Sequence, residues 1–244
     1  MKLFKVNATN STNTLLKEYL LAHELEDFTI ISTDFQEKGR GQRETKWYSG
    51  KGKNLLFSVF KKFECLKAED HFYLNMSISL GLISALQNHL EQDLRIKWPN
   101  DILAGNKKIA GILIENSMRN TQIIHSIIGI GLNVNEKKFP DDLPQAISLA
   151  ILSDKEFDRD EILLNIISEL KKTMLMLEND QKKMLKSMYL QRLYKYQQPQ
   201  MFRTQQNELM MAKIIDVDDL GKLILEDSDE IKSSYGFKEI QFIY

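Results

Sequence analysis

Residues 94–134 read LRIKWPNDILAGNKKIAGILIENSMRNTQIIHSIIGIGLNV, and this stretch carries the strongest structural signal in the chain. It holds three apolar segments rich in β-branched residues, at 94–98, 109–115 and 123–134, which is typical of strands. Gly105-Asn106 is a turn signal between the first two, and Arg119-Asn120 lies near the turn between the second and third. The last two segments are therefore predicted to pair as an antiparallel hairpin.

Strands and helices alternate irregularly on both sides of this stretch. Short strands are predicted at 3–6, 28–33 and 54–60. One helix is expected after the capping residues at 10–13, and apolar residues three and four apart predict a longer helix over 73–90. Another helical stripe covers 162–177, and Met184, Met188 and Leu193 continue the helical region to about residue 196. The order of elements predicts an α+β fold, with a mixed β-sheet flanked by helices.

The character of the chain changes after Gln197-Gln198-Pro199. Four strand candidates follow in a short span, at 210–217, 220–225, 230–235 and 239–243. Short strands at this spacing favour a small β-barrel attached to the main domain. We therefore expect two domains, one over residues 1–196 and one over residues 197–244.

Composition excludes several classes of function. The 244 residues carry a net charge of −1, so a general electrostatic grip on nucleic acid is not expected. Cys65 is the only cysteine, no secretion signal is evident, and no apolar run is long enough to span a bilayer. The default expectation is a cytoplasmic protein with no membrane partner. The four histidines are scattered, and no dinucleotide or P-loop fingerprint is present.

The segment 38–53, KGRGQRETKWYSGKGK, stands out against this neutral background. It holds six lysine or arginine residues, one acid and four of the eleven glycines. Glycine lets the backbone approach an anion closely, so such a loop is suited to cradle a phosphate or carboxylate. A solvated basic surface hairpin is an equally weighted reading from composition alone.

Three clusters in the opening stretch are suited to chemistry, and each has an ordinary structural alternative. Asn100 and Asp101 follow a strand and a proline, where Asp101 could bind Mg²⁺ or the pair could form an Asx turn. Lys108 could neutralise a phosphate or only protect an edge strand. Gly129 and Gly131 point to one face of their strand, which could form the floor of a pocket. Asn133 continues on that face, and its amide could donate to and accept from the edge of a purine.

Taken together, these motifs resemble those of biotin protein ligases. The resemblance rests on Ser11-Thr12-Asn13, Gln36 with Gly39-Arg40-Gly41 and Trp47, the highly specific Lys97-Trp98-Pro99-Asn100-Asp101, Lys108-Ile109-Ala110-Gly111, and Gly129-Ile130-Gly131-Leu132-Asn133. It covers nearly the full length and implies a biotin/lipoyl ligase-like catalytic domain followed by an SH3-like barrel. Because the chain starts directly at the catalytic motifs, it resembles the monofunctional class without an N-terminal helix-turn-helix.

The resemblance implies a two-step reaction with ATP, biotin and Mg²⁺. Biotin is activated as biotinyl-5′-AMP and then passed to a lysine of a carboxyl carrier protein. Lys108 and Arg40 are the implied catalytic residues, and Asp101 the implied metal ligand. The residues implied to bind biotin are Ser11, Thr12, Asn13, Gln36, Gly39, Arg40, Gly41, Lys108, Gly111 and Gly129. Those implied to bind ATP or the adenylate are Gln42, Arg43, Trp47, Asn100, Asp101, Gly131 and Asn133.

One departure from the family pattern concerns the basic loop. Many relatives carry arginine at the positions of Gln42 and Thr45, so the hold on the adenylate is expected to be weaker here. We hypothesise that Arg43 or Lys46 partly compensates.

Two other functions stay open at this point. A lipoate or octanoate ligase or transferase would share the catalytic fold, but its acid lacks the ureido ring that the polar residues Ser11, Thr12 and Gln36 suit. A non-catalytic biotin-binding regulator would use the same residues without chemistry. Strand 123–134 could also pair across a homodimer, although a buried core strand is the favoured interpretation.

Overall fold

The computed structural model describes residues 2–42 and 45–243. Its larger sheet has seven strands in the order β1-β2-β3-β7-β6-β5-β4. These are β1 (Leu3–Val6), β2 (Thr29–Thr33), β3 (Leu55–Lys67), β7 (Gln122–Leu132), β6 (Lys107–Arg119), β5 (Asp101–Ala104) and β4 (Leu94–Lys97). Only β1 and β2 are parallel, and every other neighbouring pair is antiparallel. The predicted mixed sheet is therefore confirmed.

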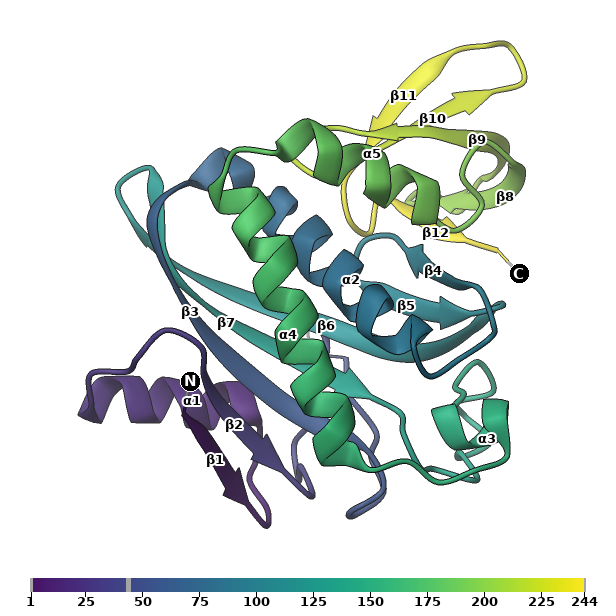
Figure 1. The fold of residues 1–244 in the computed structure, drawn as a ribbon. Helices are drawn as coiled ribbons and strands as arrows, with labels where there is room; N and C mark the ends of the chain where they lie inside the picture. Colours follow the sequence, from purple (N-terminus) through teal and green to yellow (C-terminus); the bar gives the residue numbers. More distant parts are fainter. Residues whose placement is uncertain (1, 43–44, 244) are drawn as a thin grey trace.

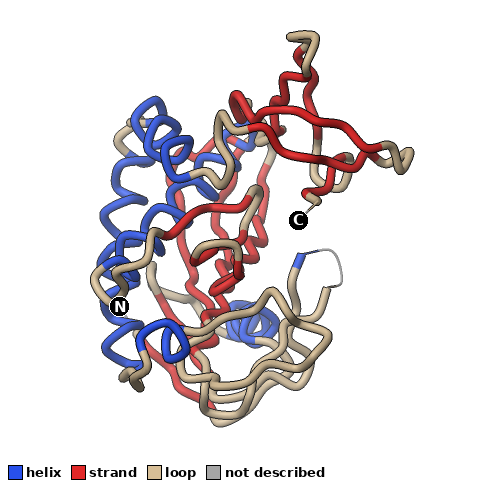
Figure 2. Tube along the Cα trace, turned by 90° about the vertical axis from the view of Figure 1, so that its right-hand side faces the viewer, coloured by secondary structure: helices blue, strands red, loops and turns tan. Residues whose placement is uncertain are grey.

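Helices cover both faces of this sheet. One face carries α2 (His71–Gln87), preceded by the short helix η2 (Ala68–Asp70), and α4 (Arg159–Glu178), which crosses α2 in Figure 1. The other face carries α1 (Thr12–Ala22), whose Leu16 packs with Ile31, Phe60 and Ile127. In Figure 2 most helices lie on one side of the strands and the long loops gather on the other. The site described below lies on the α1 side.

The hairpin predicted from residues 109–134 is present as β6 and β7. Its register pairs Gly111 with Gly131, so two glycines lie side by side on neighbouring strands. The strand predicted at 94–98 ends at Lys97, and a tight turn with a cis Trp98–Pro99 bond leads into β5. Strand β5 was not predicted from the sequence. Its four residues, with a turn at each end, are too few to show the alternation of apolar and polar residues by which a strand is recognised.

The region predicted to be a second domain contains a five-stranded antiparallel sheet in the order β11-β10-β9-β8-β12. Its strands are β8 (Pro199–Thr204), β9 (Leu209–Val217), β10 (Leu223–Asp227), β11 (Lys232–Tyr235) and β12 (Ile240–Phe242). Strand β8 was not among the four predicted strands. The proposed boundary at 196/197 stays a prediction, although β8 begins just after it.

The two sheets share one hydrophobic core. Phe202, Ile214 and Leu223 of the smaller sheet belong to the same buried cluster as Leu74 and Ile96 of the larger unit. A hydrogen bond also joins them, because Trp98 Nε1 donates to the Gly221 carbonyl at 2.9 Å. The smaller sheet is therefore fixed against the end of β4.

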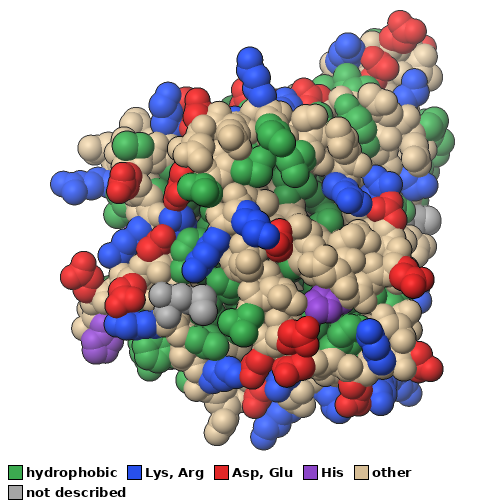
Figure 3. All heavy atoms as spheres, in the orientation of Figure 1, with side chains coloured by type: hydrophobic (Ala, Val, Ile, Leu, Met, Phe, Trp, Pro, Cys, Tyr) green, Lys and Arg blue, Asp and Glu red, His purple; other side chains and the backbone are tan. Residues whose placement is uncertain are grey.

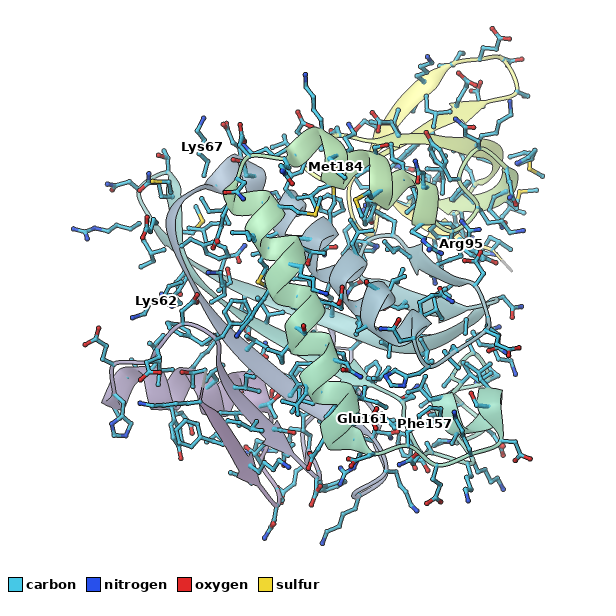
Figure 4. The ribbon with its side chains drawn as sticks, viewed as in Figure 1. Lys62, Lys67, Arg95, Phe157, Glu161 and Met184 are labelled. Atoms are coloured by element: carbon cyan, nitrogen blue, oxygen red, sulfur yellow. The ribbon has the colours of Figure 1, made fainter. Side chains whose placement is uncertain are left out.

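Two further helices complete the chain, α3 (Leu149–Ser153) and α5 (Lys182–Arg192). Helix α5 buries Leu185 and Tyr189. Met184, in the region predicted to be helical, lies on α5 and is 56% exposed; it is labelled in Figure 4. Within the described ranges, no helix combines the length and apolarity needed to cross a bilayer. Acidic and basic side chains are interspersed on the face shown in Figure 3.

Candidate active site

A cavity of about 340 Å³ lies where the N-terminus of α1, the loop before β3, strands β5 to β7 and strand β12 meet. Its size is within the range of small-molecule sites. Four basic residues line it, Arg40, Lys46, Lys97 and Lys108, against a single acid among the described lining residues, Asp101. In a protein of nearly neutral charge, this concentration of cations favours an anionic ligand.

The floor of the cavity is made of glycines on β6 and β7. The Trp47 ring lies directly on them: a Cβ added to Gly111 would come within 2.9 Å of Trp47 Cζ3, and one added to Gly131 would collide with the ring. Lys108 Nζ lies 5.3 Å from the centroid of the same ring. Trp47 Nε1 is buried without a hydrogen-bond partner in the described part of the chain. The glycine floor therefore packs against a planar ring, whose buried N–H donor is left unsatisfied by the described residues.

One end of the cavity is polar. Ser11, Thr12 and Asn13 begin α1 and are almost fully buried. The backbone N–H of Thr12 donates to Gln36 Oε1 at 2.8 Å, which holds Gln36 against the start of the helix. These four residues form what we call the polar head of the cavity.

Two of its supporting residues were missed from the sequence, Ser58 and Glu115. Ser58, on β3, is fully buried and contacts both Thr12 and Asn13. Glu115, on β6, accepts hydrogen bonds from Asn13 at 2.7 Å and Lys17 at 2.6 Å. Neither residue belongs to a recognisable motif, and each contact joins positions distant in the chain, so no local signal reveals them.

Arg40 reaches the rim of the cavity from the basic loop. Its Nη2 donates to Thr14 Oγ1 at 3.2 Å and lies 3.4 Å from Glu115 Oε2. Burial alone would raise the pKa of Glu115, but hydrogen bonds from Lys17 and Asn13 and the charge of Arg40 lower it below its ordinary value. The Glu115 carboxylate thus holds the Arg40 side chain beside the polar head.

Lys108 and Asp101 face each other across β5 and β6. Lys108 Nζ lies 2.6 Å from Asp101 Oδ1, and both side chains are partly exposed to the cavity. The neighbouring Asn100 is buried, and its Nδ2 donates to the Ile112 carbonyl at 2.6 Å, which fixes the turn before Asp101. Burial lowers the pKa of Lys97. Lys97 belongs to the Lys97–Asp101 motif, but the sequence assigned no role to its side chain.

The structure brings most of the predicted site residues to this one cavity. Those that line it are Ser11, Thr12, Asn13, Gln36, Arg40, Gly41, Gln42, Trp47, Asn100, Asp101, Lys108, Gly111, Gly129 and Gly131. Gly39 is buried beside them, where its carbonyl accepts from the Trp47 N–H at 3.0 Å. The prediction for Arg43 lies outside the described residues.

Asn133 lies behind the cavity wall. Its Nδ2 donates to the Ile147 carbonyl at 3.0 Å, and its side chain is 3% exposed. It therefore fixes the segment before α3 to β6, and a contact with adenine stays a prediction. The sequence also gave no indication that Phe237, Ile240, Gln241 and Phe242 of the smaller sheet line the cavity.

The fold and the site define a class of protein: an α+β unit whose cavity combines a polar head, a glycine floor and several cations. The chain belongs to the biotin/lipoate A/B protein ligase family, which matches residues 6–133.

Relatives in sequence agree with this membership. The bifunctional ligase/repressor BirA of Bacillus spizizenii is 31% identical over 154 residues, which is 60% of this chain and 47% of that protein. The biotin–[acetyl-CoA-carboxylase] ligase of Mycobacterium tuberculosis is 27% identical over 169 residues, which is 68% of this chain and 61% of that protein. The matched region thus spans less than two thirds of either relative.

Solved structures share the fold. The biotin protein ligase of Aquifex aeolicus, solved in complex with biotin and ATP, superposes with a TM-score of 0.82 at 24% identity, over 99% of this chain and 98% of that one. The enzyme of Leishmania major, in complex with biotinyl-5-AMP, gives a TM-score of 0.65 at 20% identity, over 96% and 98% of the two chains.

Proposed function

We propose that this protein activates biotin as biotinyl-5′-AMP with ATP and transfers the biotinyl group to a lysine of a carboxyl carrier protein. The observation that carries the proposal is the convergence of a polar head, a glycine floor and four basic residues on one cavity. The family membership and the names of the relatives agree with it.

The first step joins two anions. The carboxylate of biotin attacks the α-phosphate of ATP, the bond to the β-phosphate breaks, and pyrophosphate leaves. Lys108 and Arg40 reduce the repulsion between carboxylate and phosphate and stabilise the charge that builds up on the α-phosphate. Because Lys108 is mounted on a strand and already held by Asp101 at 2.6 Å, it needs little reorganisation.

The second step consumes the mixed anhydride. The amine of an acceptor lysine attacks the biotinyl carbonyl, an amide forms and AMP leaves with the bonding electron pair. Trp47 and the basic loop cover the glycine floor, and this cover keeps water from the anhydride.

The described residues offer one place for Mg²⁺. No cluster of three metal-ligating side chains exists within the described ranges, and Asp101 is their single cavity carboxylate. That donor set fits an ion bound by one carboxylate, water and substrate phosphates. When bound there, Mg²⁺ would neutralise phosphate charge, and Asn100 would keep Asp101 in place.

The polar head favours biotin over lipoate or octanoate. An acid without a ureido ring would leave the hydrogen-bonding groups that Thr12 and Gln36 still offer to a ligand unused, which costs binding energy. A competition binding experiment with biotin and lipoate distinguishes the two functions. We expect the affinity for biotin to exceed that for lipoate by about two orders of magnitude or more.

The test of the proposed function uses the purified chain with ATP, Mg²⁺, biotin and a carrier domain. We expect biotin-dependent pyrophosphate release and a carrier that gains one biotinyl group by mass spectrometry. Biotin binding without pyrophosphate release would instead support a non-catalytic regulator. A cytoplasmic location remains part of the proposal, tested by fractionation. Strand β7 is paired on both sides by β3 and β6, so it offers no free edge for a homodimer, and light scattering tests the oligomeric state.

A further inference from the structure

Behind the polar head, Ser58 occupies a position that the mechanism above does not use. It lies on β3 across from Gly129 and is fully buried. Its Oγ lies 2.7 Å from Thr12 Oγ1 and 2.5 Å from Asn13 Oδ1. Ser58 is not among the described residues that line the cavity, so it can act on a ligand only through those two neighbours.

The directions of these hydrogen bonds follow from counting protons. Each short contact needs one hydrogen, and an amide oxygen can only accept. The orientation of the Asn13 amide is fixed, because its Nδ2 donates to Glu115 Oε2 at 2.7 Å. Ser58 must therefore donate to Asn13, and Thr12 must donate to Ser58.

This arrangement turns the only hydroxyl proton of Thr12 away from the cavity. Gln36 Oε1, 3.3 Å from Thr12 Oγ1, is engaged by the Thr12 backbone N–H at 2.8 Å. Towards a ligand, Thr12 Oγ1 can then only accept a hydrogen bond, whereas the Gln36 Nε2 group can donate one. A ring with both an N–H and a C=O, such as a cyclic urea, matches this pair, whereas a dithiolane has no N–H to give.

We propose that Ser58 is a specificity-determining residue, which fixes the proton of Thr12 so that the polar head selects acids bearing a ring N–H. The inference rests on the proposed function and names how its substrate is chosen. Glu115 completes the chain as an acceptor that is ion-paired with Lys17 and Arg40. The order Thr12, Ser58, Asn13, Glu115 thus runs in one direction from ligand to carboxylate.

The experiment compares two acids that differ in the ring. Dissociation constants are measured for biotin and for cyclopentanepentanoic acid, which has no ring N–H, by competition calorimetry. In Ser58→Ala we expect biotin to bind about 10- to 100-fold more weakly, because Thr12 and Asn13 each lose a buried partner. The cyclopentane acid should change by less than about threefold, since it never uses the Thr12 acceptor.

Two variants serve as controls. Ser58→Thr keeps a hydroxyl and should recover most of the biotin affinity. Ser126→Ala removes another fully buried serine hydroxyl from the same sheet, bonded to Asn116 at 2.6 Å and outside the cavity lining, and should leave both affinities unchanged.

Equal losses for the two acids in Ser58→Ala, or an unchanged biotin affinity, would overturn the role of Ser58 while leaving the proposed function intact. Failure of the unaltered protein to bind biotin would overturn both.

Discussion

At the scale of single residues, Lys108 is distinguished from its neighbour Lys107 by position alone. Lys108 lines the cavity and pairs with Asp101, whereas Lys107 is exposed and lies outside the lining. We expect Lys108→Ala to slow biotin-dependent pyrophosphate release by about 100- to 1,000-fold, the usual cost of losing one preorganised charge stabiliser. Lys107→Ala is the matched control and should retain nearly full activity; similar rates in the two variants would contradict the assignment.

Glu115 gives a second prediction at this scale, because its charge supports both Asn13 and Arg40. Its folded-state pKa lies below the ordinary value of 4.5, so its contribution to stability is present above that value and is lost as pH falls through the folded-state pKa. At neutral pH, Glu115→Gln should lower the free energy of unfolding by about 1–3 kcal/mol. The difference from the unaltered protein should vanish in acid.

Urea denaturation between neutral and acidic pH measures this dependence. Glu24→Gln is the control, because the Glu24 side chain is 94% exposed and lies 3.7 Å from Lys62. It should cost little at any pH. A Glu115→Gln deficit that persists unchanged in acid would show that the charge is not the cause.

At the scale of elements, the β6–β7 hairpin forms the cavity floor with glycines, which have no Cβ. A methyl group at Gly131 would collide with the Trp47 ring. We expect Gly131→Ala to destabilise the protein by about 1–3 kcal/mol through overpacking. In a Trp47→Ala background most of that cost should disappear, since the colliding ring is gone.

A double-mutant cycle measured by urea denaturation isolates this coupling. Equal costs of Gly131→Ala in the two backgrounds would mean that Trp47 does not rest on Gly131.

The same hairpin shows what the sequence can and cannot predict. Its two strands, the turn near Asn120 and the shared face of Gly129 and Gly131 follow from local apolar patterning, turn residues and strand alternation. The contact of Asn13 with Glu115 does not, because the two residues are 102 positions apart and meet only after β6 joins the sheet. The sequence did not show that β7 ends at Leu132, so that alternation along the strand stops before Asn133.

At the scale of the whole molecule, the two sheets meet at Gly221 beside the cavity. Its φ is +84°, a Cβ there would run into the Phe72 ring, and its carbonyl accepts from Trp98. Nothing in the local pattern of residues 219–221 indicated this role beyond a turn, because Phe72 and Trp98 lie far away in the chain. Strand β12 of the smaller sheet closes one side of the cavity.

The last prediction separates backbone strain at Gly221 from its packing. Gly105 also has a positive φ, +62°, but no atom lies within 4 Å of an added Cβ, so Gly105→Ala meets the left-handed backbone penalty alone. Gly221→Ala meets a similar penalty and must also displace Phe72, so it should cost about 1–3 kcal/mol more in urea denaturation. Because β12 moves with its sheet, Gly221→Ala should also raise the ATP concentration needed for half-maximal pyrophosphate release, whereas Gly105→Ala should not. Equal stability costs, or an unchanged ATP dependence despite the larger cost, would mean that the position of the smaller sheet does not shape the site.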